Sequence, residues 1–113
     1  MSVVVVVTAF PAAGHRDEVV AAFEKAITRV HEEPGVEVYA LHEGPDPGDD
    51  LGHRGRDRLV MIEKYESERA RAEHAKRPAL ADLLADLDGK LTSKLDVQVL
   101  TPHPFGDPDK GTV

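Results

Sequence analysis

The sequence predicts an α+β fold of the ferredoxin-like split βαβ type, with one four-stranded antiparallel sheet. Three observations support this prediction. The predicted elements follow the order β-α-β-β-α-β. The first and third predicted strands are apolar on both faces, as the central strands of a covered sheet are. A chain of 113 residues is long enough for one domain with a single hydrophobic core.

The first predicted strand contains five consecutive valines, Val3–Val7. β-Branched residues favour an extended backbone, and the run is much shorter than the roughly 20 apolar residues of a membrane span. We expect no secretory signal peptide, because only Met1 and Ser2, with no Lys or Arg, precede the run. A strand in a soluble cytoplasmic protein is therefore expected.

A helix is predicted between the turn at 11–14 and the Pro34-Gly35 pair, followed by a strand over 36–42. The apolar residues of this helix recur at spacings of three and four: Val19, Phe23, Ala26, Ile27 and Val30. The next segment, 44–57, contains four Gly and two Pro and is predicted to be the most mobile internal loop.

The second half of the chain repeats the pattern of strand, helix and strand. A strand is predicted over 59–65, then a short helix that Ser67 caps and that Pro78 interrupts. A further helix carries five leucines on one face: Leu80, Leu83, Leu84, Leu87 and Leu91. The last strand is predicted over 95–101, where apolar and polar residues alternate.

The apolar outer face of the predicted sheet indicates a homodimer. Two helical segments cover only one face of four strands, and the simplest cover for the other face is the same face of a second copy. Alternatively, the valines reflect strand propensity alone and the Pro- and Gly-rich tail closes that face. Residues 1–101 are expected to form the domain and 102–113 an extended arm. In that arm Phe105 would pack on the partner, with Asp107 or Asp109 paired to a basic residue there.

Composition argues against several classes of function. The formal net charge of −7 disfavours nucleic acid and an anionic membrane surface as partners. The absence of cysteine excludes disulfides, thiolate metal sites and cysteine nucleophiles. The six histidines show no spacing that puts two ligands on one face, so no metal is expected. The arginines at 54, 56 and 58 share their segment with Asp49, Asp50 and Asp57, which favours a solvated loop over an anion site.

Three short patterns resemble the antibiotic biosynthesis monooxygenase (ABM) family, including its quinol monooxygenase-like members. These are a Tyr-x-Leu-His after the first helix, a Glu-x-Tyr closing the third strand, and an Ala-x-x-x-His on the short helix before a Pro. They comprise Tyr39, Leu41, His42, Glu63, Tyr65, Ala70 and His74. The tail PHPFGDPDKG is also similar to that of one bacterial subgroup. The resemblance implies a dimeric α+β barrel.

The resemblance also implies an activity. Members of the family oxygenate polycyclic phenols and quinols without flavin, haem or metal, and others degrade haem. The well-described branches use an Asn on the first strand and a Trp on the third. Here Thr8 lies near the first position and Tyr65 occupies the second, which disfavours haem degradation. We expect a cofactor-independent monooxygenase that oxidises a quinol- or anthrone-like aromatic molecule with O2. The alternatives are a non-catalytic dimeric binder or sensor of aromatic metabolites, or a purely structural homodimer.

Four side chains are the candidate catalytic residues. His74 is the candidate base because a neutral imidazole titrates near working pH; otherwise it packs or caps at its helix end. Tyr65 could line a pocket and donate a hydrogen bond to a substrate oxygen. Glu63, on the same strand face, is either a partner of an arginine or an acid–base group. His42 and Tyr39 fall on opposite faces of their strand, so only one can face the pocket. His42, the more polar of the two, either faces the pocket or makes a hydrogen bond at the dimer interface.

Overall fold

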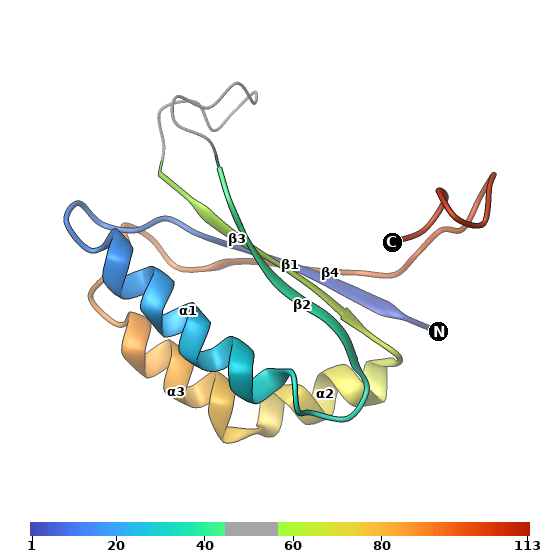
Figure 1. Ribbon diagram of the computed structural model, residues 1–113, viewed down its shortest axis with the longest axis horizontal. Coiled ribbons are helices and arrows are strands. Elements are labelled where there is room, and N and C mark those ends of the chain that lie inside the picture. The colour runs from blue at the N-terminus through green and yellow to red at the C-terminus, as the bar shows by residue number, and fades with distance from the viewer. Residues whose placement is uncertain (45–56) are drawn as a thin grey trace.

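The computed structural model describes residues 1–44 and 57–113 (Figure 1). Its elements are β1 (Val3–Ala9), α1 (Arg16–Val30), β2 (Val36–Glu43), β3 (Leu59–Tyr65), α2 (Glu68–Lys76), α3 (Pro78–Leu87) and β4 (Asp96–Leu100). This order confirms the predicted βαββαβ fold, in which two consecutive helices form the second helical segment. The predicted mobile loop lies, except for its end residues, outside the described residues.

The four strands form one antiparallel sheet in the order β2-β3-β1-β4. The two doubly apolar strands, β1 and β3, are therefore central, as predicted. In this register Val5 lies between Glu63 on β3 and Val99 on β4. Figure 1 shows the helices on one side of the sheet, so one sheet face is covered by helices and the other is not.

Local sequence signals explain where the helices begin and end. The Ser67 hydroxyl accepts a hydrogen bond from the Ala70 amide at 3.1 Å, which caps α2 as predicted. Pro78 starts α3, since proline lacks an N–H and fits the first helical turn. The last helix ends at Leu87, four residues before the predicted Leu91. Leu91 instead forms an isolated bridge with Pro11, after a turn at Gly89 with φ of +76°.

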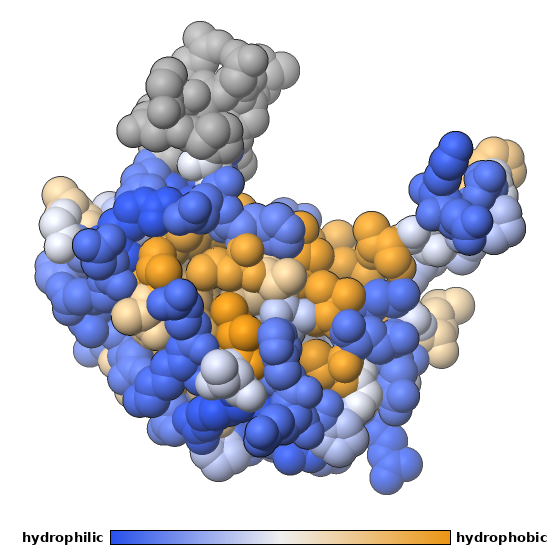
Figure 2. All heavy atoms as spheres, viewed as in Figure 1, coloured by the Kyte–Doolittle hydropathy of each residue, from blue (hydrophilic) through white to orange (hydrophobic). Residues whose placement is uncertain are grey.

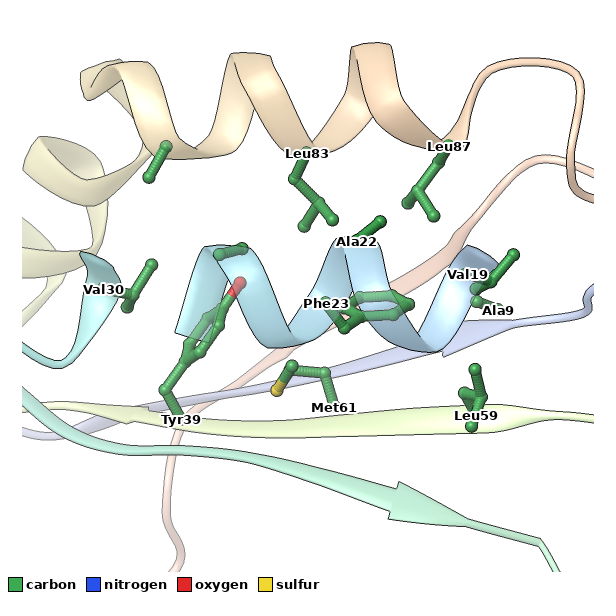
Figure 3. Packing of buried hydrophobic residues seen from close by; sticks show 12 residues of the cluster. Ala9, Val19, Ala22, Phe23, Val30, Tyr39, Leu59, Met61, Leu83 and Leu87 are labelled. Carbon is green, nitrogen blue, oxygen red and sulfur yellow. The ribbon is translucent and has the colours of Figure 1, made fainter. Parts of the chain in front are cut away.

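The main core lies between the helices and the covered sheet face (Figure 3). Phe23 on α1 and Leu83 on α3 point toward Met61 on β3 and Tyr39 on β2. Leu87 closes the same layer at the other end of α3. The apolar stripes predicted for the helices therefore pack on the sheet.

The opposite sheet face is apolar, and no helix of the described chain covers it (Figure 1). Strand alternation places Val6 on this face, beside Ile62 of β3. The chain's own tail and Val4 line a hollow, and the Val4 side chain is buried there. Farther along the face, Val6, Val60 and Ile62 remain partly exposed. The tail therefore closes only one end of this face.

The C-terminal tail leaves β4 and projects away from the body of the domain (Figure 1). It ends in a turn in which the Asp107 side chain accepts from the Asp109 amide at 2.8 Å and the Asp107 carbonyl accepts from the Gly111 amide at 2.7 Å. Phe105 is 84% exposed, with its apolar ring in solvent. The tail is thus an arm with a folded tip, and its aromatic side chain has no cover within the described chain.

If the predicted homodimer forms with Phe105 on the partner, deleting Pro104–Val113 is expected to weaken it and to leave the secondary structure of each subunit intact. Sedimentation velocity and far-ultraviolet circular dichroism measure the two effects. A matched pair of point variants, Phe105→Ala and Lys110→Ala, separates the aromatic contact from a general effect of the arm. Unchanged dimer affinity after truncation would rule out this role.

Candidate functional site

An apolar cavity of about 210 Å³ lies between the covered sheet face and the helices α2 and α3. Its walls come from all four strands and all three helices of the described chain. Those walls contain Val5, Val7, Phe23, Tyr39, Glu63, Tyr65, Arg71, His74, Ala75, Leu80, Leu83, Leu84, Leu95, Val97 and Val99. Aliphatic residues dominate this set, and the few polar groups come from β2, β3 and α2.

The cavity is open along β4, the edge strand. Leu84, Val97 and Val99 line it and yet are each about half exposed. This edge is at the back of the view in Figure 2, whose visible face also has hydrophobic residues across its middle, surrounded by hydrophilic ones. A cavity with such a mouth suits a flat apolar ligand that extends beyond the enclosed volume.

A hydrogen-bonded pair, Tyr65 and Glu63, forms the polar wall on β3. Both side chains point to the helix side, and the Tyr65 hydroxyl donates to a Glu63 carboxylate oxygen at 2.5 Å. Burial raises the pKa of Glu63, although Tyr65, His74 and Arg71 act in the opposite direction. Burial and the neighbouring Glu63 also raise the pKa of Tyr65, so its hydroxyl keeps its proton at neutral pH.

His74 faces this pair from α2. It shares the buried side of that otherwise polar helix with Ala70, one helical turn away. Its ring centroid lies 5.4 Å from that of Tyr65 and 5.6 Å from that of Tyr39. Its Nδ1 lies 3.0 Å from a carboxylate oxygen of Glu33.

The structure brings three of the four predicted site residues together: His74, Tyr65 and Glu63. His42 is not among them. It is exposed and pairs with Val60 on the uncovered sheet face, with its Nδ1 3.1 Å from the Ala40 carbonyl. Tyr39 is the residue of β2 that lines the cavity, opposite Glu63.

Thr8, the residue near the family's strand asparagine, does not line the cavity. It alternates with Val7 and lies on the uncovered face, level with Val60 and Asp96. Val7 supplies the cavity wall from this part of β1. The cavity wall is therefore aliphatic at this point of β1.

Two residues of the site were missed in the sequence: Glu33 and Arg71. Glu33 follows the carboxyl end of α1, where the helix dipole disfavours negative charge. Arg29, four residues earlier in the last turn of α1, is the partner that the sequence would have suggested, but Arg29 binds Asp82 instead. No local signal therefore marks Glu33. Arg71 lines the cavity while its guanidinium holds Glu68, with contacts of 2.8 and 2.5 Å. Its spacing from Glu68 alone would have suggested only a surface ion pair.

Within residues 1–44 and 57–113, no three His, Asp or Glu side chains gather closely enough to hold a metal ion. In the same part of the chain no helix is long and apolar enough to cross a membrane.

Replacing Glu63 with glutamine is expected to stabilise the protein as pH rises. The ordinary pKa of a glutamate is 4.5 and burial raises it here. The stabilisation that Glu63 contributes is therefore present below pH 4.5 and is lost as pH rises through the folded-state pKa. The loss is about 1.4 kcal/mol for each unit by which the folded-state pKa exceeds the unfolded-state pKa. Glutamine should remove this loss and still accept from Tyr65. Urea denaturation from pH 4 to pH 8 measures it, with exposed Glu37→Gln as the control. Parallel pH dependences for Glu63→Gln and wild type would contradict the prediction.

Residues 2–86 match the model of the antibiotic biosynthesis monooxygenase (ABM) family, and the chain belongs to this family. Membership supports a monooxygenase in general and confirms the resemblance noted in the sequence. Comparison with curated proteins found no match.

Solved structures agree with this assignment. The chain is 28% identical to Rv0793 from Mycobacterium tuberculosis, with a TM-score of 0.80 over 95% of this chain and all of that one. A structure described as an antibiotic biosynthesis monooxygenase is 17% identical, with a TM-score of 0.75 over 90% and 99% of the two chains. The protein SO0527 from Shewanella oneidensis is 20% identical, with a TM-score of 0.74 over 88% of each. The last two similarities concern the fold alone.

Proposed function

We propose that the cavity binds a quinol- or anthrone-like aromatic molecule and that the protein oxidises it with O2 without a cofactor. The observation that carries the proposal is the placement of His74, Tyr65 and Glu63 at the polar wall of an otherwise aliphatic cavity. An apolar pocket with a few convergent polar groups is the usual form of a small-molecule site. Family membership adds independent support for oxygenation.

His74 acts as the general base in this proposal. Ground-state O2 is a triplet and takes electrons one at a time, so the substrate must first become a strong electron donor. A hydroquinone or an anthrone becomes one when it loses a proton. The Nδ1 of His74 is engaged with Glu33, and Nε2 is the nitrogen left to take that proton. The aliphatic walls exclude water and hold the ring.

Tyr65 binds and polarises the substrate oxygen. Its hydroxyl keeps its single proton, because burial and Glu63 raise its pKa. In the structure that proton is donated to Glu63. It can turn to a developing phenolate or enolate when the Glu63 carboxyl group, whose pKa burial raises, carries a proton of its own and donates it to the Tyr65 oxygen. Glu63 holds that hydroxyl in place at 2.5 Å.

The reaction balances without an external reductant. An anthrone loses two hydrogens from its CH2 group, gains one oxygen atom as C=O, and the second oxygen atom leaves as water. A quinol likewise yields a hydroxyquinone and water. All four electrons come from the substrate. The proton that His74 takes returns to the oxygen that leaves as water.

The proposal includes a homodimer formed by the uncovered sheet faces. Its support is the apolar outer face, where Val6, Val60 and Ile62 are only partly exposed in the single chain and no helix covers them. Two such faces packed together would bury a core between sheets about 10 Å apart. The exposed Phe105 would then lie on the partner's surface.

A second candidate function is a non-catalytic binder or sensor of aromatic metabolites on the same fold. It is favoured by the absence of the strand Asn and Trp, since Thr8 faces away from the cavity and Tyr65 replaces the Trp. A purely structural role is disfavoured, because the space between sheet and helices contains a cavity and is not filled by side chains.

Oxygen uptake by metal-stripped protein with a panel of quinols and anthrones tests the proposal. We expect uptake above the rate without protein, unchanged by a chelator. Saturable quenching of tyrosine fluorescence by the same compounds without oxygen uptake would support the binder instead. If no compound of the panel binds and none causes oxygen uptake, both candidate functions are contradicted.

A further inference from the structure

Glu33 and His74 form a buried pair from distant parts of the chain. Glu33 lies in the turn between α1 and β2, and His74 lies on α2, 41 positions later. The Oε1 atom of Glu33 lies 3.0 Å from the Nδ1 atom of His74, and each side chain is only 7% exposed. Buried polar side chains nearly always have hydrogen-bond partners, and these two side chains satisfy each other.

We propose that Glu33 is a positioning residue that fixes the tautomer and the ring orientation of His74, so that Nε2 presents its lone pair to the cavity. The inference deepens the proposed function, since its use is to prepare His74 as a base. The arrangement of the two groups can nevertheless be tested without any turnover.

Hydrogen-bond chemistry assigns the proton. A carboxylate only accepts hydrogen bonds, so a contact of 3.0 Å to Nδ1 places the proton on that nitrogen. In the neutral imidazole the other nitrogen, Nε2, is then unprotonated. In the described chain Nε2 has no hydrogen-bond partner of its own, and His74 lines the cavity. An isolated histidine favours the opposite tautomer, with the proton on Nε2, so the carboxylate must overcome that preference.

The backbone and one cation hold Glu33 in place. Its amide donates to the Val30 carbonyl at 2.9 Å, which anchors the turn. The Arg77 Nε lies 3.7 Å from the same carboxylate oxygen. The dipole of α1 disfavours a carboxylate at this helix end, so Arg77 and His74 supply the compensating contacts. A carboxylate with restricted freedom is well suited to orient an imidazole ring.

Nitrogen-15 NMR of the imidazole rings tests the tautomer directly. Protein labelled in histidine is measured at a pH above which its spectra no longer change, and the His74 signals are assigned by their loss in His74→Gln. We expect the proton on Nδ1 in the wild type. Glu33→Gln, whose amide oxygen can still accept, should keep this tautomer, and Glu33→Leu should move the proton to Nε2. Glu32→Leu in the same turn is the matched control.

An Nε2-protonated ring in the wild type, or an unchanged tautomer in Glu33→Leu, would overturn the proposal. Because Glu33→Leu also removes a buried contact, circular dichroism and the unchanged signals of the other five histidines show whether the fold survives. If Glu33→Leu does not fold, Glu33→Ala replaces it in the same measurement.

Kinetics give a second readout with the substrate that the oxygen-uptake panel identifies. Glu33→Leu should lower kcat by about 10- to 100-fold with little change in KM, and Glu33→Gln should lower it less. An unchanged kcat in both variants would contradict the positioning role. Absence of turnover in the wild type would contradict the proposed function alone, and the tautomer of His74 would still decide the role of Glu33.

Discussion

Replacing Val6 with aspartate is expected to dissociate the proposed dimer into monomers of 12.3 kDa or to cause aggregation. Val6 lies on the uncovered face, beside Ile62 and Gln98 in the register of the sheet. An unpaired carboxylate buried there costs several kcal/mol. Light scattering at micromolar concentration measures the mass of wild type and variant.

The matched control is Thr28→Asp, which adds the same charge on the exposed side of α1. Its dimer affinity should equal that of the wild type. A monomeric wild type at micromolar concentration, or a Val6→Asp protein that dimerises with unchanged affinity, would show that the uncovered face has another use.

Replacing His74 with glutamine is expected to lower kcat by about 10²- to 10⁴-fold, because the proposed base is lost while the side chain keeps a similar size. The stability of the fold should change less, since Gln can still contact Glu33. Oxygen uptake with the substrate found in the panel measures the effect. His42→Gln is the control, because His42 lies on the other face of the sheet and does not line the cavity.

His42→Gln should therefore retain the oxygen uptake of the wild type. If instead His42→Gln abolishes uptake and His74→Gln does not, the cavity between sheet and helices is not the reaction site.

Much of the fold could be predicted from local patterns. The run Val3–Val7 and the segment 59–65 are apolar on both faces, and the structure places them in the centre of the sheet. The stripe through Val19 and Phe23 packs on the sheet as its spacing predicts. Ser67 caps α2 through the Ala70 amide, only three residues away, so its role can be predicted from the sequence.

Features that depend on distant contacts could not be predicted. Leu91 continues the leucine spacing of α3, but the chain leaves the helix at Asp88, and Leu91 pairs with the distant Pro11 instead. Alternation showed that Tyr39 and His42 face opposite ways, yet the position of the helices decides which one meets the cavity. Glu33 has no periodic neighbours, and its partner lies 41 positions away. Each of these depends on how the layers stack.

The central claim is that this family member inserts oxygen into an aromatic substrate by base catalysis alone. Reaction of metal-stripped protein with ¹⁸O2 and a substrate from the panel tests it most directly, with mass spectrometry of the product and the water. We predict one labelled oxygen atom in the product and one in water, at a rate that a chelator leaves unchanged and His74→Gln abolishes. A product without label, or incorporation that requires added metal or flavin, would contradict the claim.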